Sequence, residues 1–413
     1  MQLPFINDLE DVELVLPTPL RMCASTQYTG KGITIAFLDS GFYPHPDLTQ
    51  PTNRIAYFVD ARGDPAEGQP IREGVGFSIP HLSSWHGTMT SCACAGNGFM
   101  SMYRYAGLAP DARLVLVKTG NLHNRRIRDQ DIQRALRWVL DNAQRFDVRV
   151  VNISLGGDHP TNGKLTPLDV LVEEAVARGI VVVCAAGNSG APRVMSPASA
   201  PSAITVGGLN DHNSLDRARH TLYHSNYGRG GRGTTKPEVI APAQWVAAPM
   251  LPRTKVHNEA QFLWKIERAT DRELARLLRT KEARKRISAE TMSRPLHEIR
   301  RIVRQRINDQ KFIHPHYQHV DGTSFSAAIV SSVVAQMLEA NPSLTPAQVK
   351  QILIQTARPL DDALLERQGA GAVHAGAAVD LALKMRRRKG VRRQPLDRAA
   401  QDRAAQDCAA QSA

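Results

Sequence analysis

Four residues of types that take part in nucleophilic catalysis stand where loops or helices are expected to begin. Asp39 ends the apolar run ITIAFLD, His86 opens HGTMTSCACAG, Asn188 follows IVVVCAAG, and Ser324 lies in DGTSFSAA before a long apolar segment. Taken singly, each has a structural explanation, as a helix cap, a packed histidine or a turn residue. Taken together, they are the components of a nucleophilic acyl-transfer site.

The four residues have distinct roles in such a site. Ser324 would be the nucleophile, because a neighbouring imidazole, His86, can take its proton near neutral pH. Asp39 would orient that imidazole and stabilise the imidazolium as it forms. The oxyanion needs two hydrogen-bond donors, and we expect the backbone N–H of Ser324 and the carboxamide of Asn188 to supply them. A helix that begins at Ser324 would also favour developing negative charge there.

Five Val- and Ile-rich runs predict the strands that must position these residues. The runs lie at 33–39, 112–118, 148–154, 180–187 and 203–209, with helical patterns at 131–146 and 167–179 between them. Continuous apolar runs separated by helices indicate parallel strands buried on both faces. The expected fold class is therefore α/β, a doubly wound and mostly parallel sheet. Ligands bind such sheets at the carboxyl ends of the strands, where Asp39 and Asn188 are expected.

The composition is that of a globular protein, with 42% hydrophobic residues among 413. The N-terminus lacks the positive start and unbroken apolar stretch of a signal peptide. No run of about 18 apolar residues is present to span a membrane. The five cysteines do not have the spacing of a disulfide framework. We therefore expect a cytoplasmic protein with reduced cysteines and no membrane contact.

The positive charge is concentrated in two segments of the chain. Residues 250–320 hold 17 Lys and Arg against 8 Asp and Glu, and residues 384–413 hold 9 against 3, within a net charge of +13. The remainder of the chain is therefore close to neutral. The basic character belongs to an insert and a tail, and either could contact a polyanion or an acidic protein.

The order Asp, His, Ser along the chain resembles that of the subtilase family. So do the motifs around and between these residues: AFLDSGFYPHPDL, HGT, GLAPDARLVLVK, NISLGG, VVVCAAGNSG, KPEVIAPA, GTSFSAA and QGAGAVHAGAA. They cover about residues 30–250 and 317–384. The resemblance implies a subtilisin-like fold and a serine endopeptidase that hydrolyses peptide bonds through an acyl-enzyme, closest in character to the intracellular members.

The resemblance also implies a cleft in which an extended polypeptide substrate binds as an added strand. One edge of that cleft is expected at Ser154-Leu155-Gly156-Gly157. The facing edge is expected at Thr119-Gly120-Asn121, and the wall of the primary specificity pocket at Ala185-Ala186-Gly187. Glycine suits such positions because the substrate backbone must approach closely.

Two carboxylates depart from, or only partly match, the family pattern. Asp321 precedes Gly-Thr-Ser where the family often has an uncharged residue, and it either favours basic side chains nearby or caps the turn. Asp47 aligns with a calcium ligand of many subtilases, but calcium takes six to eight oxygens. No cofactor is expected for catalysis, and calcium is left open with no ligands assigned.

Four segments make up the expected domain organisation. An N-terminal arm, 1–29, precedes a peptidase domain, 30–384, which is interrupted by a basic helical hairpin at 250–316. The hairpin is expected from helical apolar spacing within 258–287 and again after Pro295. It is a solvated decoration, a lid or substrate-docking arm, or a surface for nucleic acid or an acidic protein. The tail, 385–413, is rich in charge and poor in apolar residues, so disorder is expected.

Two further questions stay open at this point. Leu3-Pro4-Phe5-Ile6 in the arm is either a short inhibitory strand across the cleft or an ordinary surface segment. The whole chain, in turn, is either an active peptidase or a binding or regulatory protein that uses the basic insert and tail on a protease-fold scaffold. The complete set of Asp39, His86 and Ser324 favours the peptidase.

Overall fold

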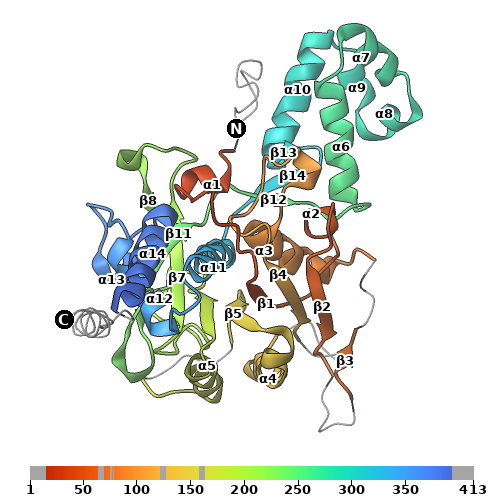
Figure 1. Ribbon diagram of the computed structural model, residues 1–413. Helices are drawn as coiled ribbons and strands as arrows, with labels where there is room; N and C mark the ends of the chain where they lie inside the picture. Colours follow the sequence, from red (N-terminus) through yellow and green to blue (C-terminus); the bar gives the residue numbers. More distant parts are fainter. Residues whose placement is uncertain are drawn as a thin grey trace, which may run out of the picture.

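A mostly parallel β-sheet forms the centre of the molecule (Figure 1). The computed structural model describes residues 15–63, 69–74, 77, 79–120, 127–157 and 163–392. Within these residues, nine strands form the sheet in the order β11-β7-β6-β5-β1-β4-β2-β3, with β8 paired to β7. Neighbouring strands from β11 to β2 are parallel, whereas β3 and β8 join antiparallel.

Five of the nine strands, β1, β4, β5, β6 and β7, coincide with the predicted apolar runs, whereas the other four were not predicted. The nine are β1 (Thr34–Asp39), β2 (Ile55–Asp60), β3 (Arg72–Glu73), β4 (Arg113–Lys118), β5 (Val148–Ile153), β6 (Val181–Ala185), β7 (Ile204–Asn210), β8 (Thr221–Leu222) and β11 (Val239–Pro242). All of β1 is buried, with Ile35 and Phe37 in the core on one face and Ala36 and Leu38 in the core on the other. This two-sided burial confirms the predicted doubly wound α/β fold.

Helices cover both faces of the sheet. α3 (Trp85–Ala95), α11 (Thr323–Ala340), α12 (Pro346–Thr356) and α14 (Ala375–Arg392) share one core with it, and α4 (Asp129–Phe146) and α5 (Pro167–Ala177) share the other. The short helices α1 (Thr18–Arg21), α2 (Pro46–Thr49) and α13 (Leu365–Gln368) lie in connections. α11 is long and apolar enough to cross a membrane, but 94% of it is buried inside the fold, as expected for a core helix.

Two small antiparallel sheets lie outside the main one. β9 (Gly228–Arg229) pairs with β10 (Thr235–Lys236). β12 (Val246–Pro249), β14 (Tyr317–Val320) and β13 (Phe312–His314) form a sheet with β14 in the middle. β14 leads directly to the start of α11, so this second sheet adjoins the segment that carries Ser324.

Residues 250–316, which we call the insert, are fully described and mainly helical. Their helices are α6 (Lys255–Glu267), α7 (Asp271–Leu278), α8 (Lys281–Arg286), α9 (Ala289–Met292) and α10 (Leu296–Asp309). The expected two-helix hairpin is therefore wrong: α10 matches the second helix, but the first is broken. Thr270 and Thr280 each accept a hydrogen bond from a backbone N–H three residues on, so each caps a new helix and ends the one before.

The insert has its own apolar core and projects from the main body beside β12, β13 and β14 (Figure 1). Leu263 and Ile266 of α6 and Ile299 and Val303 of α10 are buried in that core. An ion pair between Lys311 and Asp321 joins the insert to the main body. Directly after the insert, the Tyr317 hydroxyl donates to Asp47 Oδ2 at 2.6 Å, and within the insert His257 Nε2 lies 2.8 Å from His316 Nδ1.

The described part of the N-terminal arm packs on the main body. Val15 is buried beside Tyr317, and Arg21 pairs with Asp211 at 2.6 Å while donating to two backbone carbonyls. Residues 3–6, discussed above as an inhibitory strand, lie outside the described residues.

The tail does not begin where the sequence predicted. Helix α14 continues past residue 385 to Arg392. Leu381, Leu383 and Met385 pack against the sheet core, and Arg386 donates to the Ala340 carbonyl at 3.1 Å. The expected start of disorder at 385 is thus wrong, because these contacts hold the helix on the body. Residues 393–413 lie outside the described residues.

Candidate active site

Asp39 is the last residue of β1 and has no exposed surface. β1 lies between β5 and β4, so Asp39 stands in the middle of the carboxyl edge of the sheet. Its carboxylate accepts from the Ser40 N–H at 2.7 Å and from the Thr90 hydroxyl at 3.2 Å. A buried carboxylate is stable only when it is paired and hydrogen-bonded, and these donors meet part of that need.

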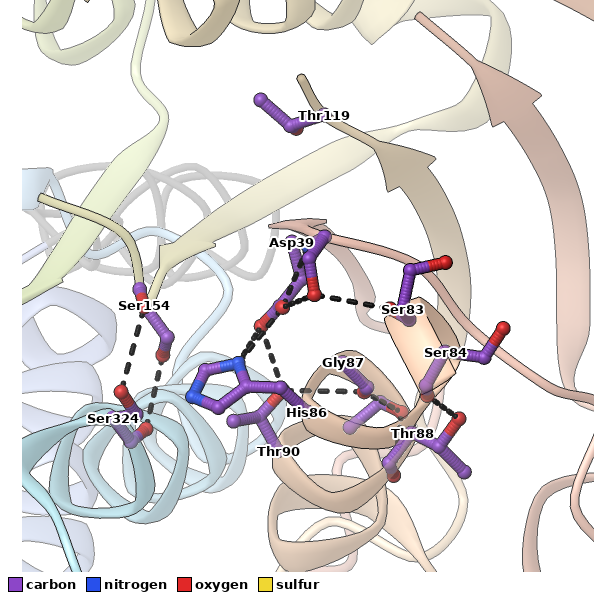
Figure 2. Close-up of polar contacts among 12 residues, drawn as sticks. Asp39, Ser83, Ser84, His86, Gly87, Thr88, Thr90, Thr119, Ser154 and Ser324 are labelled. Carbon is purple, nitrogen blue, oxygen red and sulfur yellow. Dashed lines mark hydrogen bonds and ion pairs between the residues drawn. The ribbon is translucent and has the colours of Figure 1, made fainter. Parts of the chain in front are cut away.

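His86, in the first turn of α3, completes the pairing of Asp39 (Figure 2). Its Nδ1–H donates to both carboxylate oxygens, at 2.8 Å to Oδ1 and 2.9 Å to Oδ2. Burial lowers the pKa of the imidazole, but the charge and hydrogen bonds of Asp39 outweigh this, so the pKa of His86 is raised. Because Nδ1 carries the proton, Nε2 is left as a base.

Ser324 lies in the first turn of α11, two residues after Gly322, the glycine that caps the helix. Gly322 has φ 138° and ψ 150°, a conformation that side chains other than glycine's rarely allow. The first N–H groups of a helix have no acceptor four residues back within it. Asn188 accepts from the Thr323 N–H and the Gly322 carbonyl from the Phe325 N–H, so the candidate oxyanion donor in this turn is the N–H of Ser324. The placement suits a serine whose attack on a carbonyl generates an oxyanion.

The end of β5 holds Ser324 in place. The Ser154 hydroxyl donates to the Ser324 carbonyl at 2.9 Å, and Ser324 Oγ donates to the Ser154 carbonyl at 3.4 Å (Figure 2). Among the described residues, no hydrogen bond yet joins Ser324 Oγ to His86 Nε2, although the His86 ring lies between Asp39 and Ser324. Catalytic hydrogen bonds of this kind often tighten only when substrate binds.

Asn188 is turned so that its amide nitrogen is left for a ligand. Its Oδ1 accepts from the Thr323 N–H at 2.8 Å and from the Thr323 hydroxyl at 2.9 Å. The Gly187 N–H in turn donates to that hydroxyl at 3.1 Å. Because both donors fix the oxygen, Nδ2 faces away from Thr323, and the side chain is exposed. The geometry is that of an oxyanion donor next to the nucleophile.

The segments expected to bind substrate follow β4, β5 and β6, on either side of Asp39. Thr119 is buried, and its N–H donates to the Asp39 carbonyl at 2.7 Å. The side chains of Ser154 and Ala186 are also buried, so these segments would offer a substrate mainly backbone. The exposed or half-exposed members are Leu155, Gly156, Gly157, Ala185 and Gly187, while Gly120 is buried and Asn121 lies outside the described residues.

The sequence analysis missed residues that support the site from outside it. Asn226 Oδ1 accepts from the Ser189 N–H at 2.9 Å and the Ser189 hydroxyl at 2.7 Å, which holds the loop after Asn188. Asn152 donates to Ser154 at 3.0 Å and accepts from Ser331 at 3.0 Å. The contact of Asn152 with Ser154 is local, but those of Asn152 with Ser331 and of Asn226 with Ser189 join segments far apart in the sequence, so residue types and spacing carry no signal for them.

The surroundings of Asp47 do not fit calcium. Both carboxylate oxygens already accept protein hydrogen bonds, from the Tyr317 hydroxyl and from the Met100 N–H at 3.1 Å. The guanidinium of Arg54 takes the backbone carbonyl of Asp47 and two others nearby. Burial also raises the pKa of Asp47 to about 6, which disfavours a bare carboxylate. Calcium needs six to eight free oxygens, and this site has none to spare.

The same carboxylate lies near a nitrogen and a sulfur donor, in His45 and Cys92. His45 Nδ1 accepts the Asp47 N–H at 3.2 Å, and all three side chains are buried. Burial lowers the pKa of His45 to about 3 and raises that of the Cys92 thiol. Both shifts favour the neutral forms of His45 and Cys92.

Comparison with known proteins gives the geometry a context. Residues 30–371 match the model of the subtilase family. Serine protease AprX from Bacillus subtilis (strain 168) is 29% identical over 359 residues, which are 85% of this chain and 67% of that protein. Subtilisin BL from Lederbergia lenta is 31% identical over 47% of this chain and 61% of its own length. Subtilisin E from Bacillus subtilis (strain 168) is 34% identical, over 46% of this chain and 44% of its own length.

Solved structures share the fold at lower identity. The CspB protease of Clostridium perfringens superimposes with a TM-score of 0.63 at 15% identity, covering 89% of this chain and 98% of that one. Proteases from Pseudoalteromonas arctica superimpose with a TM-score of 0.56 at 21% identity, covering 89% of this chain and 94% of theirs. At this level of identity the likeness bears on the fold alone.

The raised pKa of His86 predicts the acid limb of the pH profile. Neutral imidazole is the base, so kcat/KM should rise with pH through the His86 pKa, above its ordinary value of about 6.5. Asp39→Asn removes the charge that raises this pKa, so the limb should move to lower pH. Loss of the carboxylate should also lower kcat by about 10⁴-fold. The measurement is hydrolysis of a chromogenic peptide across pH.

Asp111→Asn, at an exposed carboxylate, is the matched control and should leave the profile unchanged. An acid limb that stays in place in Asp39→Asn would show that Asp39 does not set the pKa of the base.

Replacement of Asn188 should lower the rate of the chemical step. Asn188→Ala removes the Nδ2 donor, and loss of one oxyanion donor costs about 10²–10³-fold in kcat, with KM little changed. Asn188→Asp keeps an oxygen for Thr323 but has no amide donor, so its kcat should fall as well. Steady-state kinetics on a small peptide measure both. An Asn188→Asp variant with full kcat would limit Asn188 to holding Thr323.

Proposed function

This chain belongs to the subtilase family, and on that premise we propose that it is a serine endopeptidase that cleaves peptide bonds through an acyl-enzyme formed on Ser324. The observation that carries the proposal is the contact of His86 Nδ1 with both oxygens of buried Asp39, beside the first turn of α11. Because this contact keeps the imidazole proton on Nδ1, Nε2 is left as the base that an otherwise weak serine nucleophile needs.

The reaction would proceed in two halves. Ser324 Oγ attacks the scissile carbonyl carbon while its proton passes to His86 Nε2, and the carbonyl oxygen becomes an oxyanion held by Asn188 Nδ2 and the Ser324 N–H. The imidazolium then gives its proton to the leaving amine as the C–N bond breaks. Water, deprotonated by the same Nε2, attacks the acyl-enzyme and releases the new carboxylate and Ser324.

The substrate in this proposal is an extended polypeptide. The segments after β4 and β5 flank Asp39, and their exposed backbone is suited to pairing with a strand. Gly156 has open space where a side chain would stand, so a substrate backbone could approach it closely.

A fluorophosphonate probe tests the proposed function, because it labels only an activated serine. We expect the wild-type protein to be labelled and to cleave peptides, and Ser324→Ala and His86→Ala to do neither. Ser343→Ala, at an exposed serine just beyond the other end of α11, is the control and should be labelled. A folded wild-type protein that stays unlabelled would favour the binding or regulatory reading instead.

The basic outer face of the insert is proposed to dock acidic polypeptide substrates. Six exposed basic side chains lie on α7 and α8 and at their junction: Arg272, Arg276, Arg279, Lys281, Arg284 and Lys285. The first three are spaced by four and three residues, so they form one stripe on α7. Nearby aromatics Phe262 and Trp264 are buried and could not stack on bases, which favours a carboxylate-rich peptide over single-stranded nucleic acid.

The docking proposal is tested with one fluorogenic peptide, made with and without a tract of glutamates. The tract should lower KM for the wild type at low salt, and Arg272→Gln/Arg276→Gln/Arg279→Gln should remove this gain. Arg113→Gln, at an exposed arginine that begins β4 of the main sheet, is the control. Equal KM for both peptides in the wild type would refute the proposal, and tight binding of an oligonucleotide would point to nucleic acid.

A cytoplasmic location is also proposed. Its support is that Cys23, Cys92, Cys94 and Cys184 are free thiols, and burial raises the pKa of the last three. Free thiols are typical of proteins from reducing compartments. Cell fractionation tests the proposal, and recovery of the protein with a secreted marker would contradict it.

A further inference from the structure

The insert ends immediately before the segment that carries the nucleophile. β13 follows α10, β14 pairs with β13, and only Asp321 and Gly322 separate β14 from α11. β14 also pairs with β12 on its other side. One short strand, β14, therefore connects the insert to the helix turn that carries Ser324.

Lys311, at the junction of α10 and β13, reaches across to this segment. Its Nζ forms an ion pair with Asp321 Oδ2, and its carbonyl accepts from the His319 N–H at 2.9 Å. Lys311 has φ 59°, a conformation that costs free energy for a residue with a side chain. Lys311 directly follows Gln310, the C-cap of α10, and a left-handed residue at that position ends the helix and turns the chain towards β13.

The other oxygen of Asp321 is held from the opposite side. The Trp245 N–H donates to Asp321 Oδ1 at 3.3 Å, and Trp245 also has a positive φ, 58°. The Trp245 ring stacks on His319, with 4.4 Å between ring centroids. The Gly322 N–H donates to the Ala243 carbonyl at 2.7 Å. Asp321 thus joins the insert, through Lys311, to the segment between β11 and β12.

The Lys311–Asp321 pair is not suited to a large role in stability. The two side chains are 48% and 26% exposed, and ion pairs at such sites contribute little to folding. Their location is more informative, because Asp321 lies on the turn that leads to Ser324. The next two residues of that turn are near Asn188: Thr323 donates to its side chain, and Gly322 lies close to it. An unpaired carboxylate on this turn would bring negative charge towards the oxyanion and free the turn to move.

We propose that the insert sets the geometry of the nucleophile turn, with Lys311 acting as a positioning residue through Asp321. Lys311 touches neither substrate nor reacting atoms, so its effect is on the orientation of Ser324 and its oxyanion donors. The inference rests on the proposed function, because it concerns the same serine. It adds a specific task for the insert, that of holding the catalytic turn.

The test compares charge, shape and rescue at one position. Lys311→Met keeps the length of the side chain without its charge, and kcat for a short neutral peptide should fall by about ten- to a hundredfold, as for a small misplacement of reacting groups. KM and the thermal unfolding midpoint should be unchanged. Lys311→Arg should restore kcat. Lys265→Met, at an exposed lysine on α6, is the matched control and should match the wild type.

A double-mutant cycle separates the pair from its surroundings. Asp321→Asn should lower kcat on its own, and Lys311→Met/Asp321→Asn should lower it no further than the larger single effect, because both changes break one interaction. The rate of fluorophosphonate labelling should follow kcat in every variant. Unchanged kcat in folded Lys311→Met, or additive losses in the double variant, would overturn the inference. A wild-type protein that is not labelled at all would instead refute the proposed function.

Discussion

A carboxylate with no access to water, Asp39 at the end of β1, is the constraint on which the rest of this structure depends. A charge removed from solvent must be compensated within the protein, and here His86, Ser40 and Thr90 supply the donors. Meeting that requirement brings α3 against the end of the central strand. It also fixes which imidazole nitrogen carries a proton. The same hydrogen bonds therefore stabilise the buried charge and leave the other nitrogen as a base.

The nucleophile is positioned differently, by several segments that meet at the start of α11. Ser154 binds it from β5, Asn188 and Gly187 bind Thr323 from the loop after β6, and Ser326 donates to two carbonyls at β11. Each contact is short and polar within an otherwise apolar interface. Because β5, β6 and β11 are parallel strands of one sheet, their carboxyl ends lie at the same edge and reach the same helix turn.

The insert of this subtilase has its own apolar core, separate from those on the two faces of the sheet. It joins the chain just before the turn that carries the nucleophile. An insertion in a distant surface loop would leave the reacting groups unaffected. This one returns through β14 to within a few residues of Ser324, and Tyr317 ties the same strand to buried Asp47. Arg54 takes the backbone carbonyl of Asp47, and the Met100 N–H donates to its carboxylate, so protein hydrogen bonds surround Asp47 at this junction.

The sequence by itself determined the α/β class, five of the nine strands of the sheet and the candidate triad, because continuous apolar runs and the residues that close them are local patterns. It also predicted α10, but not the breaks in the first helix of the insert, where the caps at Thr270 and Thr280 outweighed apolar spacing. Only the tertiary structure decided that Asn226 braces the oxyanion loop, and that Asp321 pairs with Lys311. Such contacts join segments whose separation in sequence leaves no pattern, since their geometry exists only once the chain has folded.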